Sequence, residues 1–293
     1  MRAGCWGCEK ASVKSCPPDT DDHRISPGLP LLWAAIGSYQ AKIMDDGQFR
    51  RLLDFLGLSW KGYRKVRKGV KKRIDRYMQG LGSRAMDSFL SALEKNPGQR
   101  AQVETLMTVS ISRFFRDRKL WATIEKHVLP MIIAKEKQKI KVWSAGCASG
   151  EEIHTFKILW EELGRNLEQL PMLELWATDM SVELLDRALT GVYSSSSLRE
   201  LPEGWRSRYF RSVKGNRWAI SDSLKEGIHW KVHNLLIDEP PSKECQIIFL
   251  RNNLLTYYKD EIQRPALGRV IESLSPGGFL IIGAHEKLTT KIL

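Results

Sequence analysis

Two glycines and two adjacent acids stand out in the stretch VWSAGCASGEE, residues 142–152. Small residues around Gly146 and Gly150 would let a ligand approach the turn backbone closely, and the start of a following helix offers free N–H groups. A loop that grips a polyphosphate would carry Lys or Arg here. Glu151 and Glu152 instead favour a ligand with hydroxyls, an amino group or positive charge. The alternative is a tight turn that serves packing alone.

A carboxylate ends the second apolar run, LELWATD at 173–179. Ligands of open α/β sheets bind at the carboxyl ends of the strands, where an acid commonly holds ribose hydroxyls. The separation of Asp179 from the glycine loop exceeds that of the dinucleotide fingerprint. These features favour a nucleoside without phosphates that also carries positive charge, and S-adenosylmethionine has these properties. The alternative for Asp179 is a cap on the next helix.

The second half of the chain predicts the sheet that would position these residues. Five short runs are rich in β-branched and aromatic residues, and stretches with helical spacing lie between them. This alternation predicts a doubly wound, Rossmann-like α/β sheet. Pro265 should lie in the first turn of its helix or kink it. The five predicted strands are residues 140–146, 173–179, 228–234, 245–252 and 278–285.

Three other segments differ in pattern. Residues 192–227 carry Ser, Pro, Gly and scattered aromatics, which predicts a small antiparallel insertion. Residues 45–110 show helical periodicity and predict a small all-α domain before the α/β domain at 111–293. Residues 1–44 have no sustained periodicity and predict a disordered leader. The last predicted strand is followed by few residues, so a final antiparallel hairpin at the edge of the sheet is expected to be missing.

The five cysteines are an odd number, which favours a reducing compartment and a cytoplasmic protein. Three of them, with His23, could be drawn as zinc ligands, but the spacing matches no common zinc motif. Free thiols in the leader and no metal site are therefore expected; the three cysteines are Cys5, Cys8 and Cys16. No apolar run is long enough to span a bilayer. His154, His233 and His285 are expected to be structural.

Positive charge is concentrated in one segment of a chain whose formal net charge is +12. Residues Lys61 to Arg76 contain nine basic side chains and a single acid, Asp75. Such a surface should attract nucleic acid or an acidic protein face. A solvated helix face without a partner is the alternative.

Six blocks in order give this sequence a resemblance to a known family. The blocks are SISRFFRD, VWSAGCASGEE, LWATDMS, NLL at 234–236, IIFLRN and LSPGGFLIIGAHEKL. In this order, with the basic helical segment, they resemble the chemotaxis receptor glutamate O-methyltransferases of the CheR type over about residues 45–289. The resemblance implies S-adenosylmethionine as cofactor and methyl transfer to a carboxylate of an acidic, receptor-like helical partner that docks on the Lys61 to Arg76 stripe.

The resemblance also implies roles for single residues. Arg116 would face the reacting carboxylate together with Tyr257, although RNNLLTYY has one residue more than the usual form of its block, so Tyr258 is the alternative. Ser110 and Ser112 stand where the family usually has Asn and Thr, and Ile153 and His154 where it has Pro and Tyr. The cofactor contacts would fall on Ser112, Arg116, Ala145, Gly146, Glu151, Asp179, Asn234, Leu235, Arg251 and Asn252.

The implied chemistry is consistent with these residue types. A glutamate carboxylate is ionised at neutral pH because its pKa is about 4.3, so methylation needs no general base. Arg116 would orient the carboxylate through its planar fork, unless it only forms a salt bridge with Asp117 or another nearby acid. Two other functions remain open. One is nucleic-acid methylation, with the basic stripe holding phosphates. The other is a regulatory module that binds the cofactor with weak catalysis or none.

Overall fold

The computed structural model describes residues 44–83 and 85–288. The cysteines considered as zinc ligands, the expected leader up to residue 43 and residues 289–293 lie outside this range.

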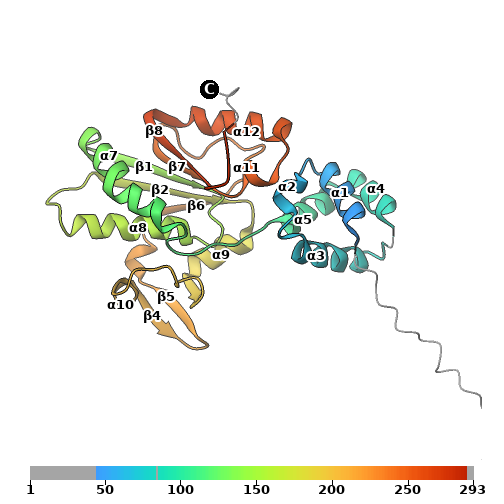
Figure 1. Ribbon diagram of the computed structural model, residues 1–293, viewed down its shortest axis with the longest axis horizontal. Helices are drawn as coiled ribbons and strands as arrows, with labels where there is room; N and C mark the ends of the chain where they lie inside the picture. The colour runs from blue at the N-terminus through green and yellow to red at the C-terminus, as the bar shows by residue number, and fades with distance from the viewer. Residues whose placement is uncertain (1–43, 84, 289–293) are drawn as a thin grey trace, which may run out of the picture. The chain divides into compact units, whose positions relative to one another are not determined.

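Five helices around one hydrophobic core form the first part of the described chain (Figure 1). Asp45 begins the first helix with a capping box, in which it and Gln48 satisfy each other's backbone N–H groups. Asn96 caps the fifth helix and Pro97 occupies its first turn. The helices are α1 (Asp46–Phe55), α2 (Trp60–Tyr63), α3 (Arg67–Gly80), α4 (Met86–Lys95) and α5 (Pro97–Met107).

A parallel sheet with the order β6-β2-β1-β7-β8 forms the second part, as the sequence pattern predicted. Both faces are buried. Ile140 and Val142 of the first strand pack in the same cluster as the helix that follows it, whereas Trp143 and Ala145 pack with the last helix. The strands are β1 (Lys139–Ala145), β2 (Met172–Asp179), β6 (Ile228–Val232), β7 (Cys245–Leu250) and β8 (Leu274–Ile282).

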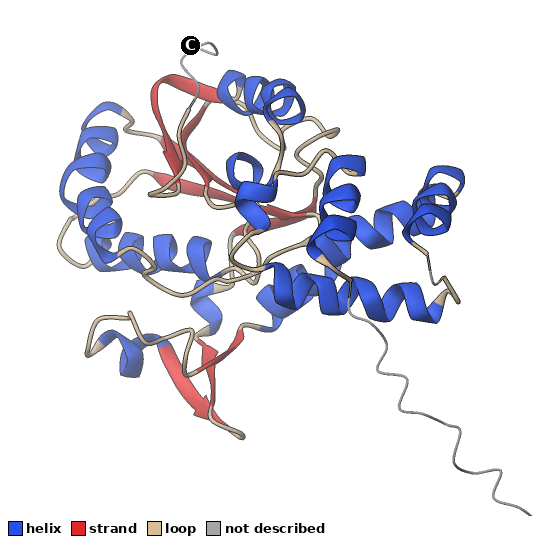
Figure 2. Ribbon diagram, turned by 45° about the vertical axis from the view of Figure 1, so that its right-hand side comes forward, coloured by secondary structure: helices blue, strands red, loops and turns tan. Residues whose placement is uncertain are grey.

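Helices cover the sheet on both faces (Figure 2). Three consecutive helical segments precede β1, and one of them is a π-helical turn that the sequence pattern did not indicate. Pro265 lies inside the last helix, beyond its first turn. These elements are α6 (Arg118–Thr123), η1 (Ile124–Val128), α7 (Leu129–Lys135), α8 (Glu151–Gly164), α9 (Val182–Thr190), α11 (Leu254–Tyr257) and α12 (Asp260–Glu272).

The predicted insertion is a separate antiparallel sheet of three strands in the order β3-β5-β4. It lies between α9 and β6 in the chain and projects away from the parallel sheet (Figures 1 and 2). Its elements are β3 (Val192–Ser194), α10 (Trp205–Tyr209), β4 (Phe210–Val213), β5 (Arg217–Ile220) and η2 (Asp222–Leu224).

The helical domain is attached to the segment after β7 by backbone hydrogen bonds. Ser59 N donates to Tyr257 O at 2.7 Å, and Lys259 N donates to Gly57 O at 2.9 Å. Gly62 permits the close approach, since a Cβ there would lie 2.1 Å from Thr256 O. Because this backbone pairing is specific, it holds α2 directly against α11.

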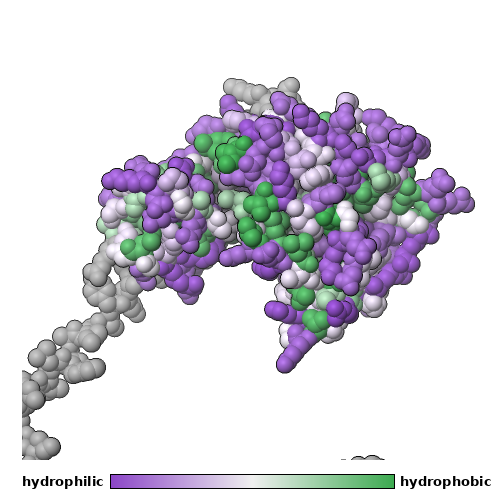
Figure 3. Space-filling model, turned by 180° about the vertical axis from the view of Figure 1, so that it is seen from behind, coloured by the Kyte–Doolittle hydropathy of each residue, from purple (hydrophilic) through white to green (hydrophobic). Residues whose placement is uncertain are grey.

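The surface in Figure 3 is mostly hydrophilic, and its hydrophobic side chains gather in separate groups. In the described part of the chain, no helix is both long enough and apolar enough to cross a membrane.

Candidate functional site

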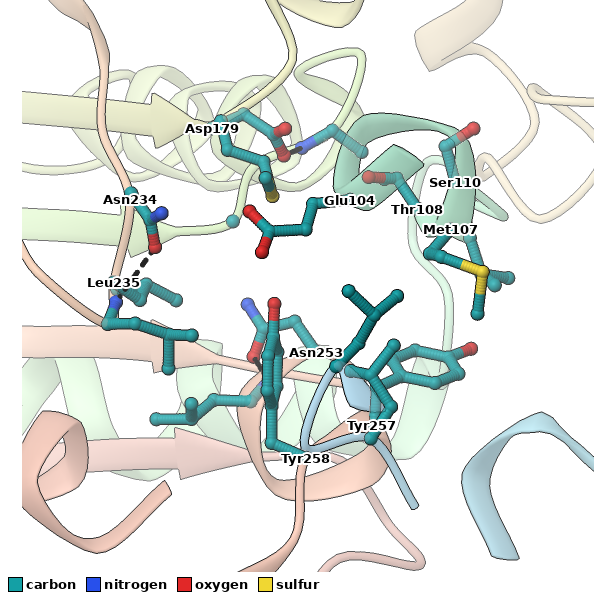
Figure 4. A pocket seen from close by; sticks show the side chains of 18 of the residues that line it. Glu104, Met107, Thr108, Ser110, Asp179, Asn234, Leu235, Asn253, Tyr257 and Tyr258 are labelled. Atoms are coloured by element: carbon teal, nitrogen blue, oxygen red, sulfur yellow. Dashed lines mark hydrogen bonds between the residues drawn. The ribbon is translucent and has the colours of Figure 1, made fainter. Parts of the chain in front are cut away.

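A cavity of about 210 Å³ lies at the carboxyl ends of the strands and is closed on one side by the helical domain (Figure 4). The sheet side contributes Gly146, Asp179, Asn234 and Leu235. The helical domain contributes Tyr63 of α2, together with residues of α5 and of the chain that follows it. These residues of α5 and of the following chain include Arg100, Glu104, Met107, Thr108, Val109 and Ser110.

The glycine loop after β1 has a backbone that favours glycine. Gly146 and Gly150 have φ values of +84° and +85°, in the left-handed region. The N–H groups of Gly146 and Cys147 both donate to Thr178 O, at 2.8 and 2.9 Å. A Cβ on Gly146 would lie 2.1 Å from the Asn253 side-chain nitrogen. At Gly146 the loop backbone therefore both turns and passes close to the Asn253 side chain.

Asp179 ends β2 and lines the cavity with a buried carboxylate. Its two oxygens accept hydrogen bonds from Ala148 N and Ser181 N, each at 2.9 Å. Burial raises the pKa of Asp179, and these backbone bonds partly offset the rise. The alternative role as a helix cap is wrong, because Ser181 caps α9 through Leu184 N. Asp179 instead connects the glycine loop to the end of β2.

The turn after β6 lines a further part of the cavity. The Asn234 side-chain oxygen accepts from Leu236 N at 3.0 Å, which fixes a tight turn. Asn234 N donates to Asp238 Oδ2 at 2.7 Å. Leu235 and Met180, the residues after Asn234 and Asp179, add apolar surface to the cavity.

The segment around Arg116 has an unusual backbone. Phe115 and Asp117 both have positive φ, at 54° and 67°, although neither is glycine. Such conformations persist where surrounding contacts enforce them and gather at functional sites. Here Phe114 and Phe115 are buried, and Phe115 N donates to Thr155 Oγ1 at 3.2 Å. The Arg116 guanidinium donates to Ile111 O at 2.7 Å.

The suggested salt bridge between Arg116 and Asp117 does not form, because Asp117 pairs with Arg251. The Arg251 side chain is only 4% exposed and also pairs with Glu152 at 2.9 Å. Asn252, the next residue, has φ of +56° and donates its N–H to Glu286 Oε2 at 2.9 Å. Arg251 and Asn252 therefore both bind side chains of neighbouring segments around the site.

Glu151 begins α8 and is buried. Its Oε2 has no hydrogen-bond partner among the described residues. Burial raises the pKa of Glu151, and the Ser112 hydroxyl partly offsets the rise. An acceptor buried in this way suits a charged donor.

Two tyrosines follow the RNN block, and both line the cavity. The Tyr257 ring lies 4.9 Å from that of Tyr63, measured between centroids. Burial raises the pKa of Tyr257, and the positive charge of Arg116 partly offsets the rise. Burial raises the pKa of Tyr258 to about 12. The geometry thus leaves both tyrosines as candidates.

The predicted site residues separate into two groups. Gly146, Asp179, Asn234, Leu235 and Tyr257 line the cavity. The others lie outside its lining, in loops or at the ends of β1 and α8; they are Ser112, Arg116, Ala145, Glu151, Arg251 and Asn252.

Sequence reasoning missed Glu104, Asn253 and Met107, which also line the cavity. Asn253 donates its amide to Ala145 O and caps α11. RNNLLTYY has one residue more than the usual form of its block, and this difference could have drawn attention to Asn253. No pattern distinguished Glu104 from the other polar residues of its helix.

The basic stripe divides into exposed and paired side chains. Arg67 and Lys71 both pair with Asp46. Arg73 donates to Leu106 O at 2.9 Å and to Thr108 O at 2.8 Å, so it holds the end of α5. The exposed basic residues are Lys61, Arg64, Lys65, Lys68, Lys72 and Arg76.

His154 lies under the glycine loop and is completely buried. The Tyr193 hydroxyl donates to Ser149 O and shares a second hydrogen bond with His154 Nδ1, both at 2.9 Å. Burial lowers the pKa of His154 to about 3, and the charge of Lys157 adds to this. The histidine is therefore neutral and supports the loop from below.

Comparison with known proteins adds family information. The family model for the SAM-binding domain of CheR methyltransferases matches residues 110–292. The chemotaxis protein methyltransferase Cher2 of Pseudomonas putida is 31% identical over 225 residues, 75% of this chain and 82% of that protein. The chemotaxis protein methyltransferase of Listeria monocytogenes is 31% identical over 233 residues, 80% of this chain and 86% of that protein.

Substitution of Gly146 by Ala should reduce affinity for S-adenosylhomocysteine by tenfold or more, measured by calorimetry. The added Cβ would displace the Asn253 side chain that holds the loop. Gly215→Ala is the matched control, because Gly215 has φ of +80° with nothing within 4 Å of the added Cβ. Both variants should lose roughly 1 kcal/mol of stability from the left-handed backbone. Parental affinity in Gly146→Ala would contradict a ligand site at this loop.

Replacing His154 by Phe should make stability less sensitive to acid. In the parent, the unfolded chain takes up the proton below pH about 6.5, whereas folded His154 resists it down to a pKa of about 3. The unfolding free energy of the parent therefore falls as pH drops from 6.5 towards 3, with a slope of up to about 1.4 kcal/mol per pH unit from this group.

Urea unfolding at pH 7, 6 and 5 would measure the slope in both proteins. His229→Gln, which alters an exposed histidine, is the control. An unchanged slope in His154→Phe would show that the buried imidazole does not cause the acid sensitivity.

Proposed function

This chain belongs to the CheR methyltransferase family, and we propose that it transfers the methyl group of S-adenosylmethionine to a glutamate side chain of an acidic protein. The chain is an S-adenosylmethionine-dependent methyltransferase. Several relatives are named chemotaxis protein methyltransferases. The observation that supports a carboxylate acceptor is the position of Arg116, whose guanidinium donates to Ile111 O, next to Ser110 of the cavity lining.

The residues present fit the cofactor. Asp179 keeps lone pairs for ribose hydroxyls, and Leu235 with Met180 offers apolar surface to the adenine. Glu151 Oε2 is a buried acceptor without a partner among the described residues, which suits the ammonium of the methionine end. The small residues of the glycine loop leave space for the ligand backbone. The cofactor would therefore lie across the ends of β1, β2 and β6.

The proposed reaction needs alignment more than proton transfer. The cofactor supplies an electrophilic methyl group. An ionised glutamate oxygen would form the new C–O bond to that methyl carbon, and the electron pair of the broken S–C bond would remain on the sulfur of S-adenosylhomocysteine. No proton moves, because the acceptor is already a carboxylate at neutral pH. Arg116 holds the carboxylate through its planar fork, and the Tyr257 hydroxyl offers a further donor.

We assign partner docking to the exposed part of the basic stripe. Lys68, Lys72 and Arg76 are four residues apart on α3 and so lie on one face of that helix. Such a row complements an acidic helical surface. The paired cations Arg67, Lys71 and Arg73 are excluded from this role, because they hold the helical domain together.

The function is tested by incubation with methyl-labelled S-adenosylmethionine and a whole-cell extract. Label on protein that base releases as methanol would support a carboxyl ester. Base-stable label on nucleic acid would favour the second function. Cofactor binding without labelled product would favour a regulatory module.

Arg116→Lys should lower turnover by tenfold or more while cofactor affinity changes little. Lysine keeps the charge but loses the planar fork that aligns the carboxylate. Arg118→Lys is the control, since Arg118 is exposed and its guanidinium donates to Glu200 O. The measurement is initial rate at saturating cofactor, with calorimetry in parallel. Parental turnover would exclude the positioning role, and a matching loss of cofactor affinity would make Arg116 a cofactor ligand.

Reversing Lys68, Lys72 and Arg76 together to Glu should raise KM for the protein acceptor at least tenfold, most strongly at low salt. Cofactor affinity should be unchanged. The control carries the same charge change outside α3, on the exposed residues Lys119, Lys126 and Lys137. An equal rise in KM for both triple variants would indicate net charge instead of a docking face.

A further inference from the structure

Glu104 is a charged residue of the helical domain whose role the family resemblance does not explain. It lies on α5 and lines the cavity. In Figure 4 its carboxylate points into the open space, with Asp179 on one side and Tyr258 on the other. We infer that Glu104 is a cofactor-binding residue that accepts a hydrogen bond from the nucleoside half of S-adenosylmethionine. The inference rests on the cofactor site proposed above.

The groups around Glu104 indicate the nucleoside half. It shares the cavity with Asp179, Asn234 and Leu235, which follow the strands that would hold ribose and adenine. Tyr258 also lines this space (Figure 4). Arg116 and Glu151, the candidates for the reacting end and the methionine end, are not part of the lining.

A second argument for cofactor binding by Glu104 is that one of its carboxylate oxygens accepts no hydrogen bond from the described residues. Each oxygen of Asp179 accepts one backbone N–H and keeps a lone pair for a ribose hydroxyl, so the remaining donors of the nucleoside need a second acceptor. Glu104 uses Oε1 for Arg100, and among the described residues no hydrogen bond to its Oε2 is found. An ionised carboxylate only accepts hydrogen bonds. The ribose hydroxyls and the adenine amino group are the donors of the nucleoside, so they match this oxygen.

Arg100 is the positioning residue for Glu104. Its Nε lies 3.1 Å from Glu104 Oε1, one helical turn away, and its guanidinium lies 5.5 Å from the centre of the Phe55 ring. The helix end is held in turn by Tyr63 and Arg73, which donate to Met107 O and Thr108 O. The helical domain would thus contribute a binding group to the cofactor site as well as a docking face.

Calorimetry with two ligands tests the inference. S-adenosylhomocysteine contains the whole demethylated cofactor, and 5′-methylthioadenosine lacks the amino-acid part. Glu104→Gln and Glu104→Ala should weaken both ligands by a similar factor, about tenfold or more, as expected for a lost hydrogen bond to a charged group. Arg100→Gln should cause a smaller loss for both. Glu94→Gln, an exposed glutamate on α4, should bind like the parent.

Three results would overturn the inference. Parental affinity in both Glu104 variants, with the fold confirmed by circular dichroism, would show that Glu104 does not bind the cofactor. A loss confined to S-adenosylhomocysteine would place the contact at the methionine half. If the parent binds neither ligand, the cofactor site itself is wrong and the inference fails with it. The parent measurement therefore separates failure of the proposed function from failure of the role of Glu104.

Discussion

The buried guanidinium of Arg251 connects the three segments on which the site depends. A buried charge is costly unless it is paired. Two nitrogens of the Arg251 guanidinium pair with Glu152 at the start of α8 and with Asp117 after the twin phenylalanines, while its Nε has no hydrogen-bond partner among the described residues. Glu152 in turn accepts from Ser144 in β1. Losing any partner would leave an uncompensated buried charge. The end of β7, the glycine loop and the turn carrying Arg116 are therefore constrained together, and the strained backbone on either side of Arg116 can persist.

A second constraint joins the helical domain to the same edge of the sheet. Asn253 links Ala145 to the start of α11, and α11 carries the backbone hydrogen bonds that hold residues 57–59. The cavity is then closed by α5, whose end is fixed by Arg73 of the basic helix. One helix thus presents cations to solvent on one face and supports the cavity wall with another. This arrangement would physically connect the proposed docking face to the site.

The sequence predicted the sheet and the strand-end residues because both depend on local pattern. Apolar runs ending in small or polar residues locate β1 and β2, and parallel strands bring Gly146 and Asp179 to one edge. Other features depend on contacts between distant segments, which no local pattern encodes. The pairing of Arg67 and Lys71 with Asp46 removed two cations from the exposed stripe. Glu104 enters the cavity only because α5 packs across the strand ends.

The charges around the site should attract the two proposed substrates more strongly than the two products. In the proposed arrangement, Asp179, Glu104 and Glu151 would face the cationic cofactor, whereas Arg116 and the exposed row on α3 would face an anionic acceptor. Methyl transfer removes one charge from each reactant, because a sulfonium and a carboxylate become a thioether and an ester. The attraction that each side exerts on its reactant is therefore weaker for the product. The same electrostatics that assemble the two substrates favour release of both products.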